Sequence, residues 1–308
     1  MIKEIIKETY KLYSNSWHRF MSIFTDNYNT LQIAPIFIRL PRYFFHKFVK
    51  HPQYEVSWRG DYIELSIDGV RFKYPTGYLN LKRRNILYHL LHFEASNLNY
   101  FSDELMGYLK NYNPKEGDVI VDLGAYSGVF SIYCAIKMKN TGKIIAFEPS
   151  KENLKLFRKA VKINNLTNIE IIEKGIWKEK DSLNFFEHGP GSLIVSGKGD
   201  FSIKVIDLDT QLKEMKIKPE DVSFIKSDVE GAEVEALMGM KSVLKNGSPK
   251  LAIASYHLRD GKKTCFFVER FLKKFGYETE TGHPKHLTTY GKKLNLQSKK
   301  EGLGVIEK

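Results

Sequence analysis

The stretch DVIVDLGAYSGVFSIYCA, residues 118–135, places a carboxylate and two glycines where a ligand could bind. A run rich in Val and Ile ends at Asp122, Gly124 and Gly128 follow, and a helix-like apolar pattern comes next. This order predicts a buried parallel strand that passes into a helix whose N-terminus faces the ligand. Because Tyr126 stands where a dinucleotide fingerprint has glycine, a pyrophosphate would be poorly cradled.

A second carboxylate, Glu148, ends the stretch KIIAFEPS. It follows the glycine turn by about 20 residues, the spacing at which a carboxylate binds ribose hydroxyls. A buried glutamate without such a partner would be costly. Asp122 and the N–H groups of the following helix suit the charged amino acid end of a ligand. An amino acid and an unphosphorylated ribose together predict S-adenosylmethionine, and a nicotinamide cofactor is the alternative.

The stretch KSDVEGAEVEAL carries the carboxylates closest to the expected chemistry. Methyl transfer is an in-line displacement, so the protein must position the acceptor and take up a proton from a hydroxyl. Carboxylates near a positive sulfur are also favourable. We therefore expect Asp228 to lie beside the methyl group and Glu230 to assist it. For Glu233 the alternative is a charge that stabilises a helix N-terminus.

Histidines offer a candidate general base. His257 ends a predicted strand beside the one that carries the carboxylates, and a histidine titrates near neutral pH; the alternative is a residue that only caps the strand. His283 and His286, in a predicted terminal hairpin, could also reach the pocket. His89 and His92 lie three residues apart, a metal-binding spacing, but no third ligand is evident. We therefore predict no metal site.

These residues need a scaffold that brings them to one edge of a sheet. From residue 119 onward, strands alternate with helices, which predicts a mostly parallel sheet covered on both faces. A terminal hairpin around residues 282–284 would add an antiparallel strand. The predicted strands are 119–123, 143–147, 169–173, 222–227 and 250–256, and the predicted helices are 129–138, 153–164, 232–245 and 265–275.

The first 113 residues differ in character from the rest. An amphipathic helix is expected at the start, and residues 54–75 alternate like an antiparallel meander. Residues 31–50 mix aromatic and basic side chains, which predicts helices packed on the main domain or a surface that meets lipid or a partner. The predicted organisation is an N-terminal helical and meander region (1–113), a main domain (114–294) and a mobile tail (295–308), with helices at 81–99 and 102–112 and with 31–112 as a lid that selects the acceptor.

Composition sets broad limits. The 308 residues are 42% hydrophobic, enough for a core, and no apolar run reaches the roughly 18–20 residues of a membrane span. The start of the chain does not resemble a signal peptide, so the expected location is cytoplasmic. The net charge of +12 is compatible with a nucleic acid, an anionic surface or a generally lysine-rich sequence. Cys134 and Cys265 have no metal spacing and are predicted to be reduced packing residues.

Three stretches resemble the successive blocks of the FkbM-type methyltransferases, a class I S-adenosylmethionine-dependent family: VIVDLGAYSGVFSIYCA, IIAFEPSKENLKLFRKAVKINNLTNIEIIEKGIW and FIKSDVEGAEVEALMGMKSVL. The third block is the most specific, and the resemblance covers residues 118–290. It implies a Rossmann-like α/β fold with a seven-stranded, mostly parallel sheet whose last strand is antiparallel, preceded by an N-terminal α+β extension. Family members usually have Asn at the position of Tyr126.

The resemblance also implies a function. The expected activity is S-adenosylmethionine-dependent methyl transfer to a hydroxyl of a sugar, glycan or other small metabolite. One alternative is an RNA methyltransferase, and another is a non-catalytic module that binds a partner or membrane. Against amino-group methylation of a base, no Asn/Asp-Pro-Pro-aromatic motif follows the fourth strand. By resemblance, Asp122, Gly124, Gly128 and Glu148 would bind the cofactor, and residues 173–177 would lie near the adenine. Tyr126, Glu173 and Asp228 complete the predicted set of cofactor-binding residues.

Overall fold

The computed structural model describes residues 54–58, 62–75, 104–186, 193–195, 199, 201–283 and 286–293. The chain divides into two units at Pro52 and Gln53, and every described residue belongs to the second unit. The predicted N-terminal helix, the aromatic and basic segment 31–50, the helix 81–99 with its two histidines, and the tail 295–308 lie outside the described residues. Among the described residues, no helix is both long and apolar enough to cross a membrane.

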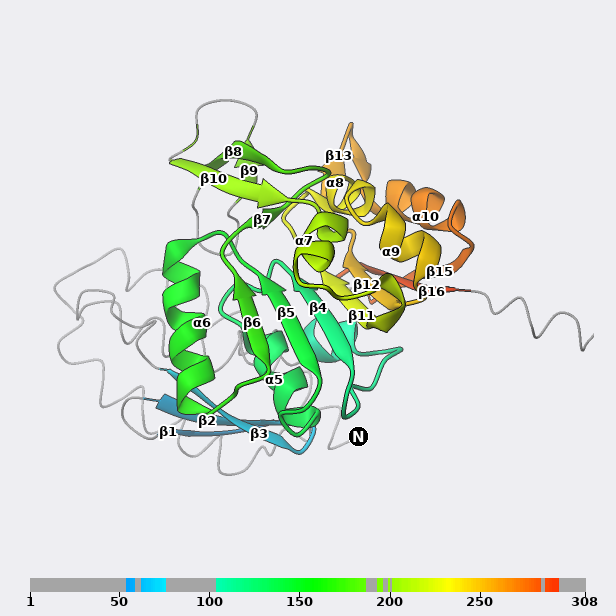
Figure 1. Cartoon of the computed structure of the whole chain (residues 1–308). Helices are drawn as coiled ribbons and strands as arrows, with labels where there is room; N and C mark the ends of the chain where they lie inside the picture. The colour runs from blue at the N-terminus through cyan, green and yellow to red at the C-terminus, as the bar shows by residue number, and fades with distance from the viewer. Residues whose placement is uncertain are drawn as a thin grey trace, which may run out of the picture. The chain divides into compact units, whose positions relative to one another are not determined.

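A seven-stranded sheet forms the centre of the fold, in the order β15-β16-β12-β11-β4-β5-β6 (Figure 1). Only β16 runs antiparallel to its neighbours β12 and β15. The predicted fold class, including the antiparallel last strand, is therefore confirmed. The strands are β4 (Val119–Leu123), β5 (Lys143–Phe147), β6 (Ile169–Ile172), β11 (Val222–Ser227), β12 (Lys250–Ala254), β15 (Tyr277–Gly282) and β16 (Thr288–Lys293).

Helices cover both faces because alternate residues of each strand point to opposite sides. In β4, Ile120 packs into a core shared with α5 and α6, whereas Val121 and Leu123 pack into a second core shared with the helices of the other face. The helices are α5 (Val129–Lys137), α6 (Lys151–Ile163), α7 (Leu208–Glu214), α8 (Glu233–Met238), α9 (Lys241–Asn246) and α10 (Cys265–Lys273), with a short 3-10 turn at η4 (Pro219–Asp221).

One predicted helix is in fact two. The pattern of residues 232–245 predicted a continuous helix, but α8 ends at Met238 and α9 begins at Lys241. Gly239 explains the break, because a side chain there would lie 2.2 Å from the carbonyl oxygen of Trp177 and 2.9 Å from Asp207. Only glycine, which has no side chain, fits between α8 and α9 at this distance from Trp177 and Asp207.

Three smaller sheets accompany the central one among the described residues, and the shortest pairs β13 (Leu258–Arg259) with β14 (Lys262–Lys263). The predicted meander is present as β1 (Tyr54–Trp58), β2 (Tyr62–Ile67) and β3 (Val70–Pro75). It packs against α5 and α6 (Figure 1), and Lys73 exchanges two backbone hydrogen bonds with the side chain of Asn164, at 2.7 and 2.6 Å. The boundary at residue 113 stays a prediction, but β3 shares the main core. A four-stranded sheet that sequence reasoning did not assign comprises β7 (Gly175–Ile176), β8 (Asp181–Phe186), β9 (Leu193–Val195) and β10 (Phe201–Ile206).

Gly128 lies immediately before α5 and allows this helix to pack closely against α6. Its φ is +84°, and a Cβ there would lie 2.0 Å from the ring of the buried Phe157 in α6. Gly128→Ala is therefore expected to lower the free energy of unfolding by about 2–4 kcal/mol, from backbone strain and overpacking together. Urea denaturation measures this loss. The matched control is Gly117→Ala, with φ of +86° and open space around it; equal losses in the two variants would show that Phe157 plays no part.

Candidate functional site

The predicted glycine turn connects β4 to α5 and lies against the segment that follows β11. The N–H groups of Gly124 and Ala125 both donate to the carbonyl of Phe147, at 3.1 and 2.8 Å. Gly124 has φ of +74°, and a Cβ there would lie 1.8 Å from the carbonyl oxygen of Asp228. Tyr126 also adopts a left-handed φ, +50°, which asparagine tolerates better than tyrosine. The asparagine that the family resemblance implies at this position fits this backbone conformation.

Glu148 lies directly under the glycine turn, at the end of β5. Its Oε2 accepts the N–H of Tyr126 at 2.8 Å, and its Oε1 accepts the N–H of Ser150 at 2.9 Å and the amide of Asn153 at 3.1 Å. A carboxylate has about four lone-pair positions, so Oε2 keeps capacity for a further donor such as a ribose hydroxyl. Burial raises the pKa of Glu148 to about 7, although these hydrogen bonds oppose the rise.

The pKa of Glu148 makes stability depend on pH. Because the folded-state pKa lies above the ordinary 4.5, the native protein binds more protons than the unfolded chain between pH 4.5 and 7. The stabilisation of the folded state by this extra proton is fully present below about pH 4.5 and is lost as the pH rises through 7. We expect Glu148→Gln to reduce the fall in unfolding free energy between pH 5 and 8 by roughly 1–3 kcal/mol. Urea denaturation at several pH values measures this difference.

The control for this titration is Glu152→Gln, an exposed residue in the first turn of α6. This variant should follow the pH dependence of the unmodified protein. Comparison between variants is needed because other buried groups contribute a slope of the same sign. A Glu148→Gln curve parallel to that of the unmodified protein would show that Glu148 ionises normally.

Asp122 is fully buried beneath the turn instead of exposed on its surface. One carboxylate oxygen lies 3.0 Å from Nζ of Lys226, and the other accepts the hydroxyl of Ser131 at 2.7 Å. Lys226 also donates to the carbonyl of Gly124 at 2.6 Å. Burial disfavours its charge, but the adjacent Asp122 raises the pKa of Lys226 above its ordinary value. Asp122 thus holds the turn through Lys226, and its predicted direct contact with the cofactor stays a prediction.

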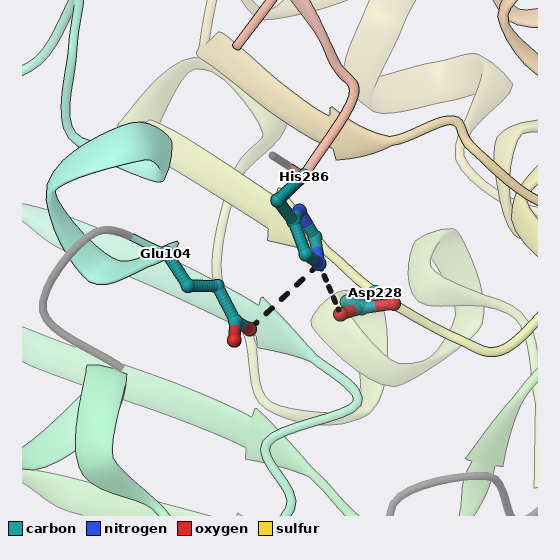
Figure 2. Close-up of side chains that lie close together, drawn as sticks. All are labelled: Glu104, Asp228 and His286. Carbon is teal, nitrogen blue, oxygen red and sulfur yellow. Dashed lines mark ion pairs between the residues drawn. The ribbon is translucent and has the colours of Figure 1, made fainter. Parts of the chain in front are cut away.

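The second half of the site surrounds Asp228, which follows β11. Its N–H donates to the carbonyl of Leu123 at 2.9 Å, which fixes it beside the glycine turn. Its Oδ2 accepts the hydroxyl of Tyr108 at 2.8 Å and lies 3.5 Å from Nε2 of His286. Figure 2 shows Glu104 beside the same imidazole, with its Oε1 3.9 Å from Nε2. We call Glu104, Asp228 and His286 the acidic cluster.

Burial and charge set the protonation of these groups. Burial disfavours ionisation of Asp228, but the hydrogen bond from His286, the charge of Lys226 and the Tyr108 hydroxyl together lower its pKa to about 2. Burial and the charge of Asp228 raise the pKa of Glu104 to about 7 and raise that of Tyr108 well above its ordinary value. Asp228 is therefore ionised at neutral pH, and Tyr108 remains a hydrogen-bond donor.

His257 does not fit its predicted role as general base. Its Nε2 lies 3.2 Å from Glu230 and its Nδ1 lies 2.9 Å from Glu233. Burial disfavours the charged ring, but these two carboxylates outweigh it and raise the pKa of His257 to about 10. An imidazole that is already protonated at neutral pH cannot accept another proton. Glu230 and Glu233 hold this cation, and the predicted assistance of Glu230 to Asp228 stays a prediction.

The remaining predicted cofactor residue, Glu173, is exposed after β6 and pairs with Arg158 of α6. Its contact with an adenine stays a prediction. Sequence reasoning rated His286 only as a residue that could reach the pocket, and it missed Glu104 and Tyr108 as site residues. Glu104 and Tyr108 lie in the helical residues 104–108, before the first strand of the sheet. The sequence around them shows only helical periodicity, which predicts a helix but not the residues that the helix contacts.

Comparison with known proteins identifies the family of this chain. A profile described as "Methyltransferase FkbM domain" matches residues 122–279, about half of the chain, and includes the glycine turn, Glu148 and Asp228. The chain belongs to this family. The predictions of the FkbM-type family and of a domain that uses S-adenosylmethionine as its methyl donor are confirmed. The carboxylate at Glu148 and the close backbone approach at Gly124 fit that cofactor.

Individual relatives are distant. "Methyltransferase 1" of Beauveria bassiana is 24% identical over 144 residues, which cover 39% of this chain and 57% of that protein, so the chain spans little more than half of its length. A SAM-dependent methyltransferase of Aquifex aeolicus is 19% identical with a TM-score of 0.41, over 68% of this chain and 98% of that one. Fibrillarin of Aeropyrum pernix, solved with S-adenosyl-L-methionine, is 14% identical with a TM-score of 0.43, over 77% and 97% of the two chains.

Proposed function

We propose that this protein transfers a methyl group from S-adenosylmethionine to a hydroxyl of a sugar, glycan or other small metabolite. The observation that carries the proposal is the position of Asp228. Its backbone contacts the glycine turn, whereas its carboxylate belongs to the acidic cluster. One residue therefore joins the cofactor side of the site to the side where an acceptor would bind.

The groups around Asp228 suit a hydroxyl acceptor. Carboxylate oxygens accept hydrogen bonds from hydroxyl groups, and Asp228 stays ionised at neutral pH. The side chains of Asp228 and Glu104 keep 13% and 20% of their surface exposed, so an acceptor can approach both. Tyr108 and Tyr256 direct their hydroxyls at Asp228, at 2.8 and 3.5 Å, and restrict its orientation.

The chemistry divides between cofactor and protein. When bound, S-adenosylmethionine supplies an activated methyl group, and the electron pair of the broken bond remains on sulfur. Glu148 and the glycine turn would hold the cofactor. Asp228 would orient the acceptor hydroxyl for in-line attack and favour the positive charge beside it. The proton lost by the hydroxyl passes to the carboxylate oxygens of the acidic cluster.

Calorimetric titration with S-adenosylhomocysteine tests the cofactor half of this proposal. We expect micromolar affinity for this compound, no binding of NADH, and loss of binding in Glu148→Ala. A panel of methyl glycosides, reducing sugars and RNA, incubated with S-adenosylmethionine labelled in the methyl group, tests the acceptor half. Label in the sugars supports the proposal. Label only in RNA would replace it with the nucleic-acid alternative, for which the net charge of +12 is the favouring observation.

A further inference from the structure

We propose that the acidic cluster binds a divalent transition-metal cation; this inference rests on the proposed function and concerns the acceptor side of the same site. Glu104, Asp228 and His286 each direct one ligand atom to a common point, with all three atoms within 4.8 Å of one another. Figure 2 shows the two carboxylates converging on Nε2 of the imidazole, at 3.5 and 3.9 Å. Ligands held about 2.1 Å from one ion lie up to roughly 4.2 Å apart, so only small side-chain shifts are needed.

The charge balance of the neighbourhood leaves room for a cation. Lys226 pairs with Asp122, and His257 pairs with two other carboxylates. Among the ion pairs of the described residues, His286 is the one basic partner of both Glu104 and Asp228. A cation placed among these three residues would meet two carboxyl groups and one imidazole, which are ligands that divalent metals bind.

Surrounding groups already fix the imidazole in place. The rings of Tyr108 and Tyr256 pack edge-on against His286, with centroids 5.2 and 4.6 Å away. The backbone N–H of His286 donates to the carbonyl of His283 at 3.0 Å, and its carbonyl accepts the hydroxyl of Thr288 at 2.7 Å. Tyr108 also donates to the carboxylate oxygen of Asp228 nearest the imidazole. Such outer groups orient metal ligands and contribute strongly to affinity.

The donor set indicates the kind of ion. One imidazole nitrogen and two carboxylate oxygens suit Mn²⁺ or Zn²⁺, whereas Ca²⁺ requires six to eight oxygens. Three protein ligands leave coordination positions open, as in catalytic sites. An ion there would bind the oxygen of the acceptor and lower the pKa of its hydroxyl.

A neighbouring group of residues provides the contrast. Asp228 also lies near Glu233 and His257, and these three could in principle surround a metal. However, both ring nitrogens of His257 face carboxylates, at 3.2 and 2.9 Å, in an ion pair that excludes a metal from the ring. The acidic cluster is therefore the site we assign.

The test uses the full-length protein, treated with chelator and dialysed, then titrated with Mn²⁺ alone. Calorimetry gives the stoichiometry and affinity, and the loss of the free-ion electron paramagnetic resonance signal gives an independent count of bound ions. We expect one equivalent to bind. Glu104→Gln and His286→Gln should each weaken binding about tenfold or more, whereas His257→Gln and the surface control Glu170→Gln should leave it unchanged. Circular dichroism and affinity for S-adenosylhomocysteine confirm that each variant is folded, and Glu104→Asp replaces Glu104→Gln if the latter does not fold.

Two results would overturn the inference. One is no uptake of Mn²⁺ by a protein that binds S-adenosylhomocysteine normally, which leaves the proposed function in place. The other is uptake that His257→Gln removes and the cluster variants do not, which would move the ion to the neighbouring group. If instead Mn²⁺ binding follows the expected pattern but S-adenosylhomocysteine does not bind, the cluster binds the ion, but its role beside an acceptor fails together with the proposed function.

Discussion

Replacing Lys226 by methionine is expected to lower the free energy of unfolding by about 3–5 kcal/mol, the cost of leaving a buried charge without its partner. The substitution keeps the length of the side chain but removes the cation that lies 3.0 Å from the fully buried Asp122. It also removes the hydrogen bond to the carbonyl of Gly124. Urea denaturation near neutral pH measures the stability, and calorimetry should show weaker binding of S-adenosylhomocysteine because the glycine turn loses its support.

Two further variants identify the origin of this loss. Lys143→Met removes an ion pair of similar length, 3.0 Å to Glu170, between partly exposed side chains. It should cost only about 0–1 kcal/mol because water screens such pairs. Combining Lys226→Met with Asp122→Asn removes both buried charges and should recover part of the stability. If Lys143→Met and Lys226→Met were equally destabilising, burial of the pair would not be the cause.

Asp228→Asn is expected to reduce methyl transfer about 10²–10³-fold, the usual effect of removing a group that acts on charge in the transition state. The amide keeps the shape of the carboxylate but loses its charge, so both the acceptor hydroxyl and the positive sulfur would be less well stabilised. Turnover of the best acceptor from the panel, at saturating S-adenosylmethionine, measures the effect.

Asp118→Asn is the matched control for this substitution. Asp118 also accepts a hydrogen bond from a tyrosine, Tyr112, but it precedes β4 and so lies at the opposite end of the sheet from Asp228. Turnover by the Asp118→Asn variant should equal that of the unmodified protein. A similar loss of turnover in both variants would point to a general loss of fold, and full activity in Asp228→Asn would remove Asp228 from the reaction.

The sequence predicted the cofactor side of this site better than the acceptor side. Gly124 and Glu148 lie within one strand–helix–strand unit, so their position follows from the local pattern of a parallel sheet. The strands that carry them, 119–123 and 143–147, were predicted with the observed bounds. Asp228 was predicted from the carboxylates that follow the fourth predicted strand.

Other features depend on packing between distant segments, which periodicity does not reveal. Gly239 interrupts a helical pattern only because Trp177 and Asp207 approach it from elsewhere in the fold. The strand predicted to run to residue 256 ends at Ala254, before His257, and the pKa of His257 depends on Glu230 and Glu233 of another segment. Glu104 belongs to the site only because the helical residues 104–108 reach His286, which is distant in sequence. Local sequence patterns carry no signal for contacts of this kind.

The acidic cluster has a consequence for the order in which the protein is made. Tyr108 and His286 are separated by 178 positions along the chain, whereas the glycine turn and Glu148 are neighbours in sequence. Closing a long loop is slow compared with forming local structure. A growing chain that has reached residue 280 therefore contains every residue assigned to cofactor binding but lacks His286. The acidic cluster is therefore among the last parts of the protein that synthesis can complete.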